Sequence, residues 1–189
     1  MKYIKYTYVD GNHMPQVGGL EFAWARESQY PTDTPEFFGT YPDGSDADVE
    51  GVLAELTEQQ YLGSLQQEVA DRKALLTQRN NQAYENALSM MTSDYPPSEI
   101  QTWERQRAEV LDWHVDNEAA TPWIDIAASA RGLDRGEYLA RTLAKVQAFA
   151  AASAWLTGRR QGIDDIIRAA LTLEQVRSIS ISYNDGVEL

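Results

Sequence analysis

Residues 57–73, TEQQYLGSLQQEVADRK, mark the point where the periodicity of the sequence changes from that of strands to that of a helix. Thr57 and Gln60 have the spacing of a capping box, in which each side chain bonds the other residue's backbone amide. The apolar residues that follow lie at helical intervals: Leu62, Leu65, Val69 and Leu76. We therefore expect a helix that runs to about Met91, where SDYPPSE stops it because proline cannot continue a helix.

The segment before this helix has the pattern of strands and turns. KYIKYTYV (2–9) alternates, with Ile4, Tyr6 and Tyr8 on one face. LEFAWARE (20–27) also alternates, which places Leu20, Phe22 and Trp24 together and Glu21 opposite. GNHMPQVGG (11–19) is turn material, and EFFGTY (36–41) is a short apolar strand candidate. The pattern predicts a small antiparallel sheet or hairpin unit.

The sequence after the first helix predicts further helices. A second helix starts at Pro97 or Ser98 and carries apolar positions at residues 100, 103, 110 and 111. Thr121 and Pro122 fit an N-cap followed by proline at the first helical position, and Gly132 suits a C-cap. The tail SISISYNDG (178–186) has the pattern of a last short strand.

An alanine-rich helix is expected between the capping-box pair Asp134 and Glu137 and about Ala170. Its apolar stripe is narrow: Leu139, Leu143, Val146, Ala150 and Ser153. Such a stripe indicates packing against another helix, as in a bundle or a coiled coil.

We therefore predict an α+β fold with two parts. Residues 1–52 form an N-terminal antiparallel β unit that is rich in aromatic residues and docks a partner. Residues 53–189 form a mainly helical region with long helices, which we expect to oligomerise. The boundary lies in the acidic loop PDGSDADVEG (42–51).

The composition excludes several classes of partner. The chain has 189 residues and a formal net charge of −13, from 16 lysines and arginines against 29 carboxylates. This balance argues against nucleic acid and anionic membrane surfaces, which attract clustered cations. The chain has no cysteine, so thiolate metal sites and disulfides are excluded. No apolar run is long enough to span a membrane, and the first residues lack the apolar core of a signal peptide.

No motif of catalysis or of cofactor binding stands out. The acidic loop residues Asp43, Asp46, Asp48 and Glu50 do not match an EF-hand, so we interpret them as a solvated linker and expect no metal. His13 lies in a predicted turn, and neither Asp112 nor Asp116 has the helical spacing that would bring it onto the face of His114. Arg159 and Arg160 suit a solvated helix surface or a clamp on an acidic partner. We expect no cofactor and no catalytic residue.

The aromatic residues of the β unit are the candidate partner-binding residues. Six rings crowd one segment: Phe22, Trp24, Tyr30, Phe37, Phe38 and Tyr41. A small sheet has to bury one face, so these rings could be its core. They exceed what so small a unit easily hides, and aromatic residues also anchor protein interfaces. Three interpretations stay open: a core, a protein interface and a platform for sugar.

Three segments resemble small proteins of tailed bacteriophages: YIKYTYVD (3–10), GLEFAWARESQYPTDTPEFFGT (19–40) and TPWIDIAASARG (121–132) with the alanine-rich helix after it. Proteins of that group are encoded beside tail-fibre or baseplate genes, and many are described as tail-fibre assembly proteins. The resemblance implies a non-enzymatic, chaperone-like protein that binds a tail-fibre or baseplate protein in the host cytoplasm.

Two alternatives accompany this expectation. The chain could be a permanent virion subunit of the tail fibre or baseplate, close to the receptor-binding apparatus. It could also be a carbohydrate-binding module in which exposed Trp24 and Tyr41 stack on sugar. If the rings dock a partner, replacing Trp24 or Phe38 with alanine should abolish partner binding, and intact binding in a still-folded variant would contradict this.

Overall fold

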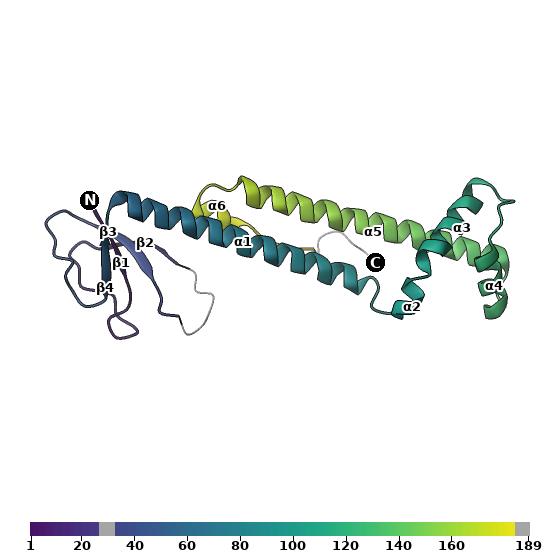
Figure 1. Cartoon of the computed structure of the whole chain (residues 1–189), viewed down its shortest axis with the longest axis horizontal. Helices are drawn as coiled ribbons and strands as arrows, with labels where there is room; N and C mark the ends of the chain where they lie inside the picture. Colours follow the sequence, from purple (N-terminus) through teal and green to yellow (C-terminus); the bar gives the residue numbers. More distant parts are fainter. Residues whose placement is uncertain (27–32, 184–189) are drawn as a thin grey trace. The chain divides into compact units, whose positions relative to one another are not determined.

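The computed structural model describes residues 1–26 and 33–183, which form two compact units. The first unit consists of residues 1–77 and 167–179, and the second of residues 78–166 and the segment from residue 180. The predicted α+β class is confirmed, because an N-terminal antiparallel sheet precedes a mainly helical region with long helices (Figure 1).

The sheet of the first unit has four antiparallel strands in the order β2-β3-β1-β4. The strands are β1 (Lys2–Tyr6), β2 (Glu21–Ala25), β3 (Phe37–Tyr41) and β4 (Val52–Leu56). Strand β4 was not predicted, and it extends the β unit past the expected boundary at residue 52. These five residues form a strand because they pair with β1. Their sequence is too short to show a clear strand pattern by itself.

One face of the sheet packs against loops. Its buried cluster consists of Ile4, Tyr6, Val17, Tyr41 and Ala47. Gly39 of β3 lies at the closest approach on this face, because a Cβ atom there would be 2.6 Å from the backbone oxygen of Glu21 on β2. The absence of a side chain at Gly39 therefore lets β2 and β3 pair.

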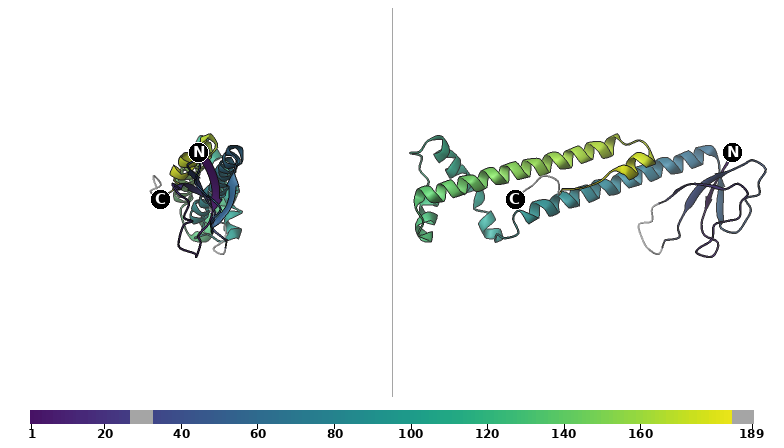
Figure 2. Two further views of the ribbon diagram at one scale, coloured as in Figure 1. Left: turned by 90° about the vertical axis from the view of Figure 1, so that its left-hand side faces the viewer. Right: turned by 180° about the vertical axis from the view of Figure 1, so that it is seen from behind.

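The opposite face of the sheet packs against two helices of the same unit. Trp24 and Phe38 stack with their ring centres 3.8 Å apart and their planes almost parallel. Tyr61 of α1 (Glu58–Met90) and Leu173 of α6 (Leu173–Ser178) complete this buried cluster. Figure 2 shows α6 alongside the first half of α1, and Lys73 Nζ of α1 donates to the backbone oxygen of Ala170, 3.0 Å away.

A β-bulge in β2 contradicts the predicted strand face. Phe22 pairs with Gly39 but Trp24 pairs with Phe38, so Ala23 is an extra residue in β2. The extra residue reverses the alternation beyond it. Phe22 consequently shares a face with Phe37, and Trp24 shares the other face with Phe38.

Helix α1 begins and ends close to the predicted positions. The capping box is formed, with the Thr57 amide donating to Gln60 Oε1 at 2.8 Å and the Gln60 amide donating to Thr57 Oγ1 at 3.2 Å. The predicted apolar stripe is wrong at Leu62, which is 47% exposed. The adjacent Tyr61 is buried instead, because the helix turns that side toward the Trp24 and Phe38 rings.

The second helix was predicted as one element but forms two, α2 (Pro97–Ile100) and α3 (Trp103–Val115). The Thr102 hydroxyl donates to the backbone oxygen of Glu99 at 2.7 Å. The Thr102 amide also donates to this oxygen, at 2.9 Å, so the chain forms a tight three-residue turn between the two helices.

Helix α4 (Pro122–Arg131) confirms the predicted first-position proline and the glycine at its end, since Gly132 has φ +64°. The N-terminal amides are satisfied by Glu109 of α3, whose carboxylate accepts from the amides of Trp123 and Ile124 at 3.1 Å. Thr121 does not cap the helix and donates to Asp125 instead, at 2.9 Å.

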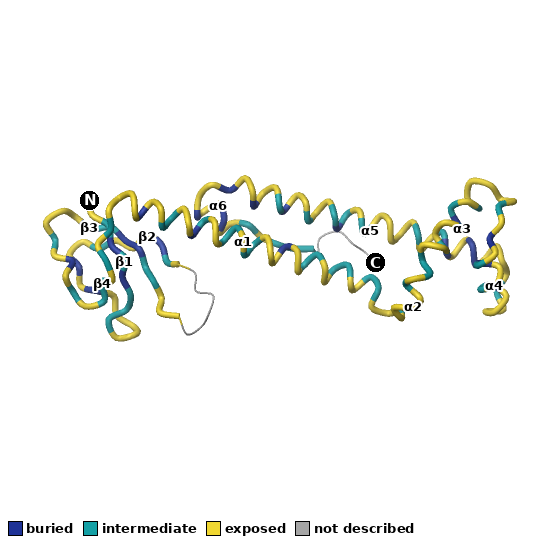
Figure 3. The backbone as a smooth tube through the Cα atoms, viewed as in Figure 1, coloured by how far each residue is buried: buried dark blue, intermediate teal, exposed yellow. Residues whose placement is uncertain are grey.

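Helix α5 (Arg135–Ala169) confirms the predicted alanine-rich helix, and the Glu137 amide donates to Asp134 Oδ1 at 3.0 Å. Leu139 is buried as predicted, but Ala150 of the expected stripe is exposed. Most of α5 is exposed, with isolated buried residues (Figure 3). The predicted last strand is also wrong over its described part, because residues 179–183 pair with no described strand and pack on helices.

Candidate protein interface

The structure separates the candidate rings into buried and accessible ones. Trp24, Phe38 and Tyr41 are core residues, with 2% or less of each exposed. Phe37 is half-buried, and Phe22 is 58% exposed. Tyr30 lies outside the described residues. The core interpretation therefore holds for three of the rings, and among the five described ones Phe22 and Phe37 remain accessible candidates.

The accessible rings belong to a cluster that we call the aromatic ladder, formed by Tyr6, Tyr8, Phe22 and Phe37. Phe37 lies at its centre, with ring-centre distances of 4.9 Å to Tyr8, 5.6 Å to Tyr6 and 6.4 Å to Phe22. Tyr8 and Phe22 approach Phe37 edge to face. Such arrangements are the favoured geometry of aromatic pairs.

The ladder runs from the core of the β unit to solvent. Tyr6 is buried, Tyr8 and Phe37 are half-buried, and Phe22 is mostly exposed on an edge strand. Tyr8 was missing from the predicted interface residues, although the alternation of KYIKYTYV placed it on the face of Ile4 and Tyr6. Aromatic side chains have few rotatable bonds, so a packed cluster of rings that reaches solvent can anchor another protein with little loss of side-chain freedom.

Ion pairs hold the start of β3 in place beside the ladder. Glu36 accepts from Lys5 Nζ of β1 and from Arg26 Nη1 after β2, each at 2.9 Å. The Arg26 guanidinium also lies 5.5 Å from the centre of the Phe38 ring. Glu36 thus ties two strands to the third immediately before Phe37, which positions that ring.

Burial at the inner end of the ladder predicts a pH effect. Desolvation, followed by the neighbouring Tyr8, raises the pKa of Tyr6 above its ordinary value of 10.0. The neutral Tyr6 phenol therefore makes a contribution to the free energy of unfolding that is fully present below pH 10. This contribution is lost as the pH rises through the folded-state pKa, because the phenol ionises at lower pH in the unfolded chain. We expect absorbance titration at 295 nm to resolve a late phenol that disappears in the Tyr6→Phe variant. A variant titration identical to wild type would contradict this assignment.

The sugar platform expected at Trp24 and Tyr41 is wrong in its stated form, because both rings are buried. Packing of the two sheet faces rather than accessibility therefore determines where these rings lie.

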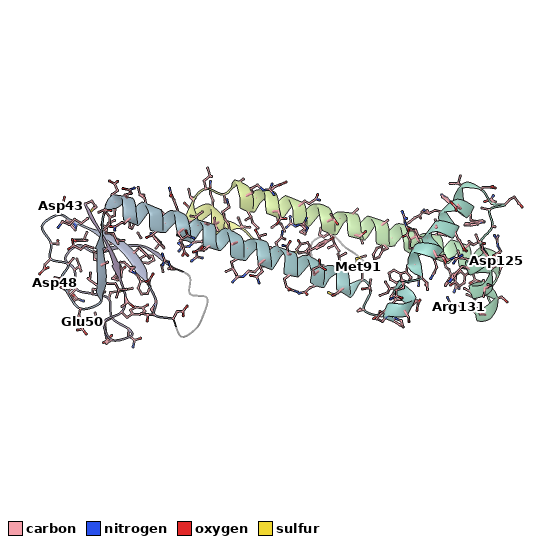
Figure 4. All side chains as sticks on the ribbon, in the orientation of Figure 1. Asp43, Asp48, Glu50, Met91, Asp125 and Arg131 are labelled. Carbon is pink, nitrogen blue, oxygen red and sulfur yellow. The ribbon has the colours of Figure 1, made fainter. Side chains whose placement is uncertain are left out.

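The acidic loop does not converge on one point. Asp43, Asp48 and Glu50 lie apart from one another around the β unit (Figure 4). Among residues 1–26 and 33–183, no group of three or more His, Asp or Glu side chains is placed to hold a metal ion. His13 Nδ1 lies 2.6 Å from Asp10 Oδ2, and this contact lowers the pKa of the exposed Asp10 carboxyl.

None of the helices in the described part of the chain is long and apolar enough to cross a membrane. Residues 144–181 match the model of one family, the HI1402 helical domain. These residues cover α5 from residue 144 to its end, all of α6 and the start of the tail. No curated protein and no solved structure matches the chain.

Proposed function

We propose that this chain is a non-enzymatic protein of a bacteriophage tail that binds a tail-fibre or baseplate protein and assists its assembly or attachment. The aromatic ladder is the observation that supports the proposal, since it offers rigid rings to a partner at the edge of a small sheet. The resemblance of residues 3–10, 19–40 and 121–132 to tail-associated proteins supplies the phage context. The protein acts in the host cytoplasm during assembly.

The charge of the β unit indicates the chemistry of the partner surface. Residues 1–56 contain three lysines or arginines against ten carboxylates. A partner that covers the ladder therefore meets negatively charged surface around it. Basic residues at the rim of the partner's apolar contact would complement this charge. Because such steering is screened by salt, we expect the association rate to fall as ionic strength rises.

Phe22→Ala tests the ladder as the docking surface. Phe22 is mostly exposed, so the substitution should change the free energy of unfolding by less than about 1 kcal/mol. Removing an aromatic anchor from an interface typically costs 2 kcal/mol or more, so we expect affinity to fall by roughly thirtyfold. The measurement is binding of the purified variant to the tail-fibre and baseplate proteins of the source phage, by calorimetry.

Leu53→Ala is the matched control. Leu53 is also an exposed apolar residue on an edge strand of the same sheet, at an irregularity in the pairing of β4 with β1. This variant should bind as tightly as wild type, because β4 lies at the other edge from β2. A folded Phe22→Ala protein that binds with wild-type affinity would refute the ladder as the docking surface.

Quantitative mass spectrometry of purified particles distinguishes an assembly factor from a permanent virion subunit. Absence of the chain from particles, together with fibreless particles after its deletion, supports the assembly factor. A fixed ratio to other tail proteins makes it a permanent subunit. Oligomerisation through the helical region stays a prediction, which sedimentation equilibrium of the purified chain tests directly.

A further inference from the structure

The C-terminal segment Ser180–Tyr183 lies on the helices of the second unit without joining a sheet. Ser180 is exposed, whereas Ile181, Ser182 and Tyr183 are half-buried. Arg159 Nε of α5 donates to the backbone oxygen of Ser182 at 3.1 Å. An extended segment with alternating apolar residues is thus fastened to a helical surface by polar contacts.

The main contact that holds this segment is a hydrogen bond to a buried side-chain amide on α1. Asn80 is fully buried, and its Nδ2 donates to the backbone oxygen of Arg160 at 3.0 Å and to Asp164 Oδ1 at 2.8 Å. Its Oδ1 accepts from the Tyr183 hydroxyl at 2.6 Å. Both amide hydrogens and the amide oxygen are therefore satisfied, and the oxygen depends on the tail. An amide buried without its partners costs free energy, so Asn80 and Tyr183 stabilise each other's position.

The groups around Asn80 form a polar layer between the two helices. Arg160 Nη1 donates to Asp164 Oδ2 at 2.6 Å, and its guanidinium lies 5.7 Å from the centre of the Tyr84 ring. The Tyr84 and Tyr183 ring centres are 6.4 Å apart, and the Tyr84 hydroxyl is 3.2 Å from Thr157 Oγ1. A buried asparagine in a helix contact favours one register over others, because every slipped register leaves it unpaired.

We propose that Ser180–Tyr183 is a latch that closes over this polar layer and holds α1 and α5 in register within the second unit. Hydrogen bonds rather than a large apolar contact hold this segment on the helices. Each such bond contributes little net stability, so the latch opens far more often than the unit unfolds. Opening removes the hydrogen bond that the Asn80 amide oxygen accepts from Tyr183 and frees the surface that the tail covers. The inference is independent of the partner named above.

Tyr183→Phe in the full-length chain tests the latch, because it removes the hydroxyl and keeps the ring. We expect backbone amides in residues 78–84 and 157–164 to exchange hydrogen about five times faster than in wild type, as measured by mass spectrometry. Ser180→Ala, which alters an exposed residue of the same segment, should exchange like wild type. Wild-type exchange rates in folded Tyr183→Phe would overturn the proposal.

Asn80→Leu provides a second test of the latch. Leucine is similar in size to asparagine, but its side chain cannot accept the hydrogen bond from the Tyr183 hydroxyl. In this background Tyr183→Phe should add little further acceleration. The short bond from the hydroxyl to the side chain of residue 80 is already gone, and only the longer contact with the backbone oxygen, at 3.4 Å, remains. The same fivefold acceleration in the Asn80→Leu background would show that the Tyr183 hydroxyl acts elsewhere, and would overturn the proposal.

Discussion

Trp24→Ala should unfold the β unit rather than remove a docking residue. Trp24 is 2% exposed and stacks on Phe38, against Tyr61 and Leu173. Truncating a buried aromatic side chain typically costs about 3–5 kcal/mol, which is comparable to the whole stability of a small unit. We expect urea unfolding, followed by circular dichroism of the sheet, to show a midpoint near zero denaturant for this variant.

Unfolding of the Trp24→Ala variant would change how its loss of partner binding is interpreted. The sequence alone predicts that Trp24→Ala abolishes partner binding by removing a docking residue, but a buried ring acts on binding only through the fold. Phe22→Ala, two residues away and exposed, is the control for stability. A Trp24→Ala protein with wild-type stability would contradict the packing described here.

Gly39→Val should separate β2 from the rest of the sheet. A Cβ atom at this position would be 2.6 Å from the backbone oxygen of Glu21 and 3.2 Å from Tyr6 Cε1. Backbone of a neighbouring strand cannot yield as a flexible side chain does, so the pairing of β2 with β3 has to break. Overpacking usually costs 1–3 kcal/mol, and we expect a value above that range because Trp24 then also leaves its buried site. Urea unfolding measures the difference.

Gly63→Ala is the matched control and should raise the free energy of unfolding, whereas Gly39→Val lowers it. Gly63 lies within α1, where a Cβ atom would meet no other atom within 4 Å. Alanine in a helix interior is about 0.5–1 kcal/mol more stable than glycine, so this variant should unfold at a slightly higher urea concentration. Equal effects of the two substitutions would contradict the close strand contact at Gly39.

The features that could be predicted from the sequence are those with a local cause. The capping box of Thr57 and Gln60, the proline and glycine that bound α4, and the Asp134 cap of α5 depend on residues a few positions apart. Their chemistry is the same in any tertiary setting, and so their positions in the structure agree with the predicted ones.

The features that could not be predicted depend on pairing between distant segments. The bulge at Ala23 exists only relative to β3, yet it determines that Trp24 is core and that Phe22 is accessible. Alternation by itself placed both rings on one face, which is why the predicted interface mixed core and surface residues. Tyr8 was missed for a related reason, since its role depends on contact with Phe37.

The order of synthesis bears on how the first unit matures. Leu173, which completes the cluster around Trp24 and Phe38, is added to the chain more than a hundred residues after Leu56. At ribosomal speeds of about 5–20 residues per second, the nascent sheet waits roughly ten seconds with only α1 available to cover that apolar face. During this interval the apolar surface that α6 later covers stays exposed, and exposed apolar surface favours aggregation of a folding chain. Maturation of the β unit is consequently delayed until translation reaches α6.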